Sequence, residues 1–280
     1  MFSTILGPLP AIDLAELGAT GLELLSTGEV QAADATPEEA VSAWRAATTA
    51  TDRPVKQVLA GPYSAGRDAG RSVPAELAER LRATIAALAA AGCAFVEVEE
   101  PEALAIAVVD GERHRFVDAH RRLLDGIGGV HVSLALNGGN LDAAGPATFF
   151  DLGYASFAFD LIAGPDNWRL IAQAPGDRGI VCGALSPAAD GDETPELLVW
   201  AAHYAASTRG RGLDRVGLAN APSLAGLSAE LALRKLGVVA NAARLAGIPG
   251  QEVAATLDPR AFGGRRDRPG GPVRVGDQEP

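Results

Sequence analysis

Polar and charged side chains stand at or near the ends of several apolar segments in this chain. They are Glu29, Glu99, Glu100, His131, Ser133, Asp160, Cys182, Ser186 and Asn220. Carboxylates in such positions need a partner, because a buried charge is costly unless something pairs with it. Several of them together indicate a pocket for a substrate amine, or a pair of groups for general acid–base catalysis.

The apolar segments that must position these groups recur along the chain with the length of buried strands. They cover residues 3–6, 21–25, 55–60, 93–98, 128–134, 155–160, 179–185 and 215–220. Helical sequence separates them, which predicts an α/β fold, a single-domain (β/α)8 TIM barrel over residues 1–250. In such barrels the catalytic side chains lie at the carboxyl ends of the strands.

Helix signals support this alternation. Thr36 and Glu39 have the spacing of a capping box, with Pro37 in the first turn. A second helix carries apolar residues on one stripe, at positions 77, 81, 85 and 88. Further helices are predicted over 13–17, 102–125, 167–173, from 195, and after Ser228.

Composition limits the class of protein. The 280 residues carry a net charge of -11, which argues against binding to nucleic acid or to anionic lipid. No run of about 20 apolar residues predicts a membrane span. Two cysteines make no disulfide framework, and we expect a cytoplasmic protein. Residues 258–280 are rich in Arg, Gly and Pro and predict a flexible tail.

Each candidate residue also has a structural interpretation. His131, predicted near the carboxyl end of its strand, is either a core histidine or a group at the catalytic rim. Glu99 and Glu100 precede Pro101 and would also suit the start of a helix, where acids are favourable. Cys182 has the character of a small buried residue. The histidines expected on helix surfaces are His114, His120 and His203.

The order of several motifs resembles the catalytic barrel of cobalamin-independent methionine synthase, in the superfamily that includes uroporphyrinogen decarboxylase. The motifs are GLELLSTGE (21–29), LAGPYS (59–64), AALAAAGCAFVEVEEPEAL (86–104), GVHVS (129–133) and RVGLANAPSLAGLSAELALRKLGVVANAAR (215–244). The resemblance extends from about Ile5 to Gly247 and implies a barrel enzyme that transfers a methyl or other one-carbon group.

The same resemblance implies a zinc site, and here the chain departs from it. The family binds zinc with a His-x-Cys pair, a glutamate and a later cysteine. His131 matches, whereas Ser133 takes the first cysteine position, Asp160 the glutamate position and residues 221–223 lack the second cysteine. A zinc site needs three or four good ligands. We therefore expect no zinc and no other cofactor, unless Cys182 points inward and supplies a third ligand.

The substrate pocket of the family is better matched. Glu29 corresponds to the glutamate that holds the substrate amine, and Glu99 stands where the family has an aspartate on the same substrate. The resemblance thus implies a small, amino-acid-like substrate. The other residues that we expect to bind it are Glu100, Ser133, Asn220 and Tyr63.

The sequence leaves three functions open. The first is a diverged methyl or one-carbon transferase that uses His131, Asp160 and Glu99 for catalysis, with His131 as the base. The second is a lyase or decarboxylase that works by acid–base chemistry without a metal. The third is a non-catalytic barrel that binds a small molecule. In each case the expected partner is a small molecule, and the oligomeric state, a homodimer included, is left open.

Overall fold

The computed structural model describes residues 4–6, 23–27, 32–33, 35–67, 73–109, 111–188, 191, 194–221, 224 and 226–248, with the backbone alone at 4–6, 23–27 and 73. Three predictions fall outside these residues: the helix over 13–17, the role of Glu29, and the tail over 258–280. Positions 222 and 223 of the expected last zinc ligand are also outside them.

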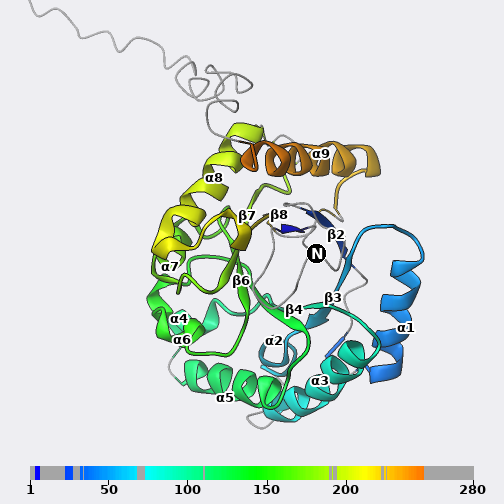
Figure 1. Ribbon diagram of the computed structural model, residues 1–280. Coiled ribbons are helices and arrows are strands. Elements are labelled where there is room, and N and C mark those ends of the chain that lie inside the picture. The colour runs from blue at the N-terminus through cyan, green and yellow to red at the C-terminus, as the bar shows by residue number, and fades with distance from the viewer. Residues whose placement is uncertain are drawn as a thin grey trace, which may run out of the picture.

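The strands follow one another around a ring (Figure 1). They are β1 (Thr4–Leu6), β2 (Glu23–Thr27), β3 (Val55–Ala60), β4 (Phe95–Glu100), β5 (His131–Leu136), β6 (Ser156–Asp160), β7 (Gly179–Leu185) and β8 (Val216–Asn220). Neighbouring strands from β3 to β8 are parallel, with one register shift on β7 between Gly183 and Leu185, so the predicted α/β architecture with a parallel sheet is confirmed.

The complete (β/α)8 barrel is not confirmed. Strand β1 runs antiparallel to both β2 and β8, whereas every strand of that barrel is parallel to its neighbours. Strand β2 is joined to β3 by only two residue pairs. The part of the molecule that positions the candidate site is therefore the six-stranded parallel sheet from β3 to β8.

Helices cover the outside of the ring (Figure 1). They are α1 (Pro37–Thr48), α2 (Pro62–Gly66), α3 (Val73–Ala90), α4 (Ala105–Val108), α5 (Glu112–Leu124), α6 (Ala147–Phe150), α7 (Trp168–Gln173), α8 (Pro195–Ser207) and α9 (Ala229–Ala246). Short 3-10 turns cover Asp142–Ala144, Pro165–Asn167, Thr208–Gly210 and Leu213–Arg215. Among the described helices, none is both long and apolar enough to cross a lipid bilayer.

Local sequence signals explain where several helices begin and end. The Thr36 hydroxyl accepts from the Glu39 amide at 3.2 Å and the Glu39 carboxylate accepts from the Thr36 amide at 2.8 Å, so the predicted capping box of α1 is confirmed. The helical sequence predicted over 102–125 forms two helices, α4 and α5. Val109 is extended after α4, and Gly111 before α5 adopts a φ of +83°, which glycine tolerates.

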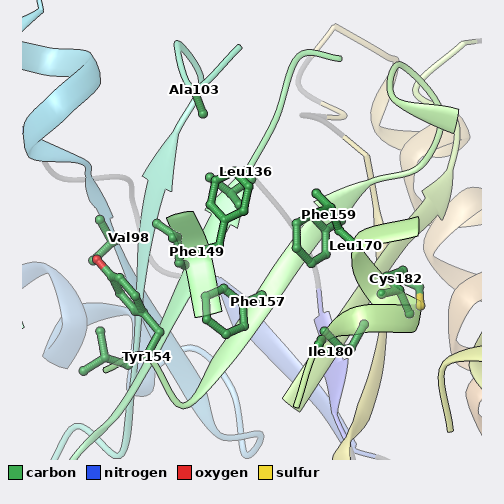
Figure 2. Packing of buried hydrophobic residues seen from close by; sticks show 14 of the residues in the cluster. Val98, Ala103, Leu136, Phe149, Tyr154, Phe157, Phe159, Leu170, Ile180 and Cys182 are labelled. Atoms are coloured by element: carbon green, nitrogen blue, oxygen red, sulfur yellow. The ribbon is translucent and has the colours of Figure 1, made fainter. Parts of the chain in front are cut away.

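Two separate apolar clusters follow from the alternation of side chains along the strands. The larger one lies between the strands and the helices and includes Phe149, Phe157 and Phe159 (Figure 2). The smaller one gathers side chains of the opposite strand face, inside the ring. Its members are Phe95, Ala135, Ala158, Val181, Ala219 and Ala221. Barrel interiors are usually filled with bulky branched side chains, whereas the described part of this interior is rich in alanine.

Candidate functional site

Three polar side chains meet the interior of the ring at the carboxyl ends of β4, β5 and β6. Glu99 is in register with Ala135 of the inner cluster, Asn137 follows β5, and Asp160 lies two residues beyond Ala158 of the same cluster. Because alternate residues share a face, these positions point into the ring. We call Glu99, Asn137 and Asp160 the mouth residues.

Hydrogen bonds hold the mouth residues in place, but two of their oxygen atoms accept no hydrogen bond. The Asn137 amide nitrogen donates to Glu99 Oε1 at 2.9 Å. Asp160 Oδ1 accepts from the backbone amides of Ile162 at 2.9 Å and Ala163 at 2.8 Å. Asp160 Oδ2 and Asn137 Oδ1 have no hydrogen-bond partner, although the side chains are only 1% and 5% exposed. A buried acceptor without a donor is costly, so the mouth suits a ligand that donates hydrogen bonds.

A buried ion pair lies below the mouth, on the same inner face. Lys56 Nζ of β3 lies 2.5 Å from Glu97 Oε1 of β4, and both side chains are fully buried. Burial lowers the pKa of Lys56, and the carboxylates of Glu97 and Glu99 oppose that shift. Neither residue is among the predicted site residues. The signal for Glu97 is its position between Val96 and Val98 on β4, whereas Lys56 is followed by Gln57 on β3 and shows no such alternation.

The predicted position of His131 is wrong. It was expected near the carboxyl end of its strand, but β5 begins at His131 and runs on to Leu136. Its ring stacks on Phe95 with centroids 4.6 Å apart, and its Nε2 lies 2.8 Å from Ser156 Oγ. Because β4, β5 and β6 are parallel, these three residues close the amino end of the ring, opposite to Asp160. The structure therefore does not bring His131 and Asp160 together.

The burial of His131 gives a pH-dependent stability that can be measured. Burial lowers its pKa from the ordinary 6.5 to about 3, whereas the unfolded chain protonates it near 6.5. The unfolded state then binds more protons between these values. The contribution of neutral His131 is complete above pH 6.5 and is lost as the pH falls through this window, by up to about 1.4 kcal/mol per pH unit.

Urea unfolding at pH 7, 6, 5 and 4 tests this expectation against the double variant His131→Phe/Ser156→Ala, which removes the imidazole and its hydroxyl partner together. We expect the wild-type free energy of unfolding to fall more steeply with acid than that of the double variant. Equal slopes would show that His131 is not buried in its neutral form.

Two predicted substrate residues, Glu100 and Tyr63, lie on the outer face of the ring. The Glu100 carboxylate accepts from the backbone amides of Tyr63 at 3.0 Å and Ser64 at 2.7 Å, and lies 3.0 Å from His120 Nε2. The Tyr63 hydroxyl donates to Glu112 at 2.6 Å. These contacts join β4 to α2 and α5 rather than line the ring. His120, expected at the surface, is fully buried.

The remaining predicted residues divide between the two faces. Ser133 faces inward in register with Glu97, and its hydroxyl has no hydrogen-bond partner. Asn220 lies between Ala219 and Ala221 of the inner cluster, so its side chain is on the opposite face. Cys182 belongs to the outer cluster beside Ile180 (Figure 2).

The described residues do not fit the zinc site that the family resemblance implies. Among them, no three His, Cys, Asp or Glu side chains are grouped as metal ligands. His131 and Asp160 are at opposite ends of the ring, and Cys182 faces outward, with burial raising its thiol pKa to about 12. A cysteine binds zinc as its thiolate, and the Cys182 side chain points away from the interior that His131 and Asp160 face, so Cys182 does not supply the third ligand there.

Comparison with known proteins places the fold. No model of a known protein family and no curated protein sequence matches the chain. Among solved structures, a B12-independent methionine synthase from Shewanella sp. W3-18-1, in complex with selenomethionine, superposes with a TM-score of 0.62 at 16% identity. The superposition covers 85% of this chain and 73% of the synthase chain. A putative vitamin-B12 independent methionine synthase from Listeria monocytogenes superposes with a TM-score of 0.55 at 16% identity. This superposition covers 74% of this chain and 68% of the Listeria chain.

These likenesses confirm the predicted resemblance to the barrel of cobalamin-independent methionine synthases. At 16% identity they concern the fold and not the reaction. Function on a shared barrel depends on the residues at its site, and Ser133 and Asp160 are two positions at which this chain departs from the expected pattern.

Proposed function

We propose that this chain is a diverged, methionine-synthase-like one-carbon transferase that does not use the zinc site of that family. In this proposal the amino group of a small, amino-acid-like substrate binds at the mouth, with Asp160 as its main partner and Glu99 beside it. The proposal depends on one observation: Asp160 Oδ2 is a buried carboxylate oxygen on the inner face of the ring that accepts no hydrogen bond.

The charges inside the ring support a cationic group. Its described side chains include one cation, Lys56, and three carboxylates, Glu97, Glu99 and Asp160, so the described carboxylates outnumber the described cation by two. An ammonium placed there is attracted by the excess of carboxylates, and the low dielectric of a buried site strengthens that attraction. Its N–H groups would also satisfy the open acceptors of Asp160 and Asn137.

The fold supports one-carbon transfer as the chemistry, and the position of His131 changes the assignment of groups. A histidine at the amino end of the ring does not reach a substrate held at the carboxyl end. Proton transfer from the substrate nucleophile therefore falls, in this proposal, to a mouth carboxylate. Such a group contributes through its position beside the reacting atom.

Replacing Asp160 with asparagine will weaken the binding of amino acids by about 10- to 100-fold, because an uncharged amide cannot replace a carboxylate opposite an ammonium. Isothermal titration of the wild type and the variant with methionine and homocysteine measures this loss. Asp151→Asn is the matched control, since Asp151 is an exposed aspartate at the end of α6. Equal affinities in the wild type and Asp160→Asn would contradict the assignment.

The transfer itself is tested with isotope-labelled methyl donors of the folate and sulfonium classes, with product detection by mass spectrometry. The proposal expects transfer that persists after dialysis against a chelator and that Asp160→Asn reduces at least 100-fold. Stoichiometric zinc together with chelator-sensitive transfer would overturn the zinc-free reaction. Amino-acid binding without any transfer would favour a non-catalytic binding barrel.

A further inference from the structure

A second group of open hydrogen-bonding atoms lies deeper in the ring than the mouth residues. Glu97 Oε2 and Ser133 Oγ have no hydrogen-bond partner, and both side chains are fully buried. Glu97 and Ser133 are paired in register on β4 and β5, so they face the interior side by side. Two unsatisfied atoms on paired residues need an explanation, because native interiors satisfy nearly all such groups.

The spacing along β4 separates the deeper group from the mouth. Glu97 precedes Glu99 by two residues, which corresponds to about 7 Å along a strand. The neighbouring inward positions carry Ala135, Ala158 and Val181, so small side chains surround this part of the interior. A narrow, extended group that reached Glu97 from the mouth would therefore pass small side chains on the described strands.

The chemistry of these two unpartnered atoms indicates which kind of ligand group would bind them. Glu97 Oε2 is an acceptor, and the serine hydroxyl accepts as well as donates. Lys56 already occupies the other Glu97 oxygen, so Oε2 is the oxygen of this carboxylate that is open to a ligand. An ammonium group matches it best, because it combines a positive charge with N–H donors for both Glu97 Oε2 and Ser133 Oγ.

From these observations we infer that the substrate is an amino acid with a second, side-chain ammonium group, which binds between Glu97 and Ser133. This inference rests on the proposed function, because it assumes that the first amino group binds at Asp160. It goes further by assigning the deeper residues as the determinant of substrate class.

Isothermal titration with lysine and norleucine tests the inference, because norleucine has the same carbon chain and lacks the terminal amino group. We expect lysine to bind the wild type at least 10-fold more tightly. Ser133→Ala should lower this preference at least threefold, because it removes the hydroxyl beside Glu97. Ser156→Ala is the matched control. Ser156 is the inward serine in register on β6, but its hydroxyl is bonded to His131, so the preference should be unchanged.

The outcomes separate the two proposals. If norleucine binds as tightly as lysine, the second ammonium site is wrong and the mouth site is retained. If the preference for lysine is unaffected by Ser133→Ala, the side-chain ammonium does not bind beside Ser133 and the inference is overturned. If neither amino acid binds, the proposed function fails together with the inference. Ser133→Ala should fold normally, because the hydroxyl that it removes has no hydrogen-bond partner.

Discussion

Replacing Lys56 with methionine will lower the free energy of unfolding by about 3 to 5 kcal/mol, because the substitution leaves a buried carboxylate without its counter-charge. Lys56 Nζ and Glu97 Oε1 lie 2.5 Å apart, and neither side chain is exposed. Methionine keeps most of the length and the apolar stem, so the expected loss reflects the charge and not a cavity. Urea denaturation monitored by circular dichroism gives the value.

A double-mutant cycle isolates the pair. Lys56→Met combined with Glu97→Leu removes both charges, and an apolar pair of similar volume is often as stable as the ion pair that it replaces. We expect the double variant to recover most of the loss. The control is Arg82→Met, which breaks an exposed pair with Glu79 on α3 and should cost less than about 1 kcal/mol. Losses that simply add would show that Lys56 and Glu97 are not coupled.

Replacing Arg211 with methionine will also cost about 3 to 5 kcal/mol, because several buried carbonyl groups would lose their donor at once. The guanidinium, in a residue only 1% exposed, donates to the carbonyl oxygens of Ala174 at 3.0 Å, Arg178 at 2.9 Å and Ala205 at 2.8 Å. Ala174 is the C-cap residue that follows α7, and Ala205 lies in the last turn of α8, where the helix dipoles favour a positive charge.

Arg211→Lys should recover only part of this stability, since an ammonium is a point charge and cannot reach carbonyls in several directions as a planar guanidinium does. The matched control is Arg169→Met, whose side chain is 65% exposed and pairs with Asp142 and Asp166 at the surface. We expect it to cost less than about 1 kcal/mol. If Arg211→Met and Arg169→Met have similar effects on urea unfolding, the carbonyl contacts of Arg211 do not stabilise the fold.

The strand pattern was predictable where apolar runs are bounded by clear turn signals. The predicted ranges 55–60 and 179–185 coincide with β3 and β7, and the range 155–160 differs from β6 by one residue. The direction of strand β1 was not predicted. An apolar run indicates that a strand exists, but it does not indicate whether that strand pairs parallel or antiparallel with its neighbours. Direction depends on the path of the connecting chain, which no local pattern specifies.

The candidate site was harder to predict because small errors at strand boundaries change which end of the ring a residue occupies. The predicted strand over 128–134 begins three residues and ends two residues earlier than β5, which covers His131–Leu136. This difference moved His131 from the carboxyl end to the amino end. Asp160 was placed correctly at the end of β6. Glu99 and Glu100 are adjacent, so only one of them can face the interior, and the alternation set by Phe95 assigns that face to Glu99.

A crystal soak with selenomethionine tests most directly whether the substrate site lies at the mouth. Diffraction recorded at the selenium absorption edge locates the ligand. We expect a selenium peak inside the ring at the carboxyl ends of the strands, with the ligand amino group about 3 Å from Asp160 Oδ2. A ligand bound instead beside His131, or on the outer face at Glu100 and His120, would contradict the assignment of the substrate site to the mouth. So would crystals that bind no ligand at saturating concentration.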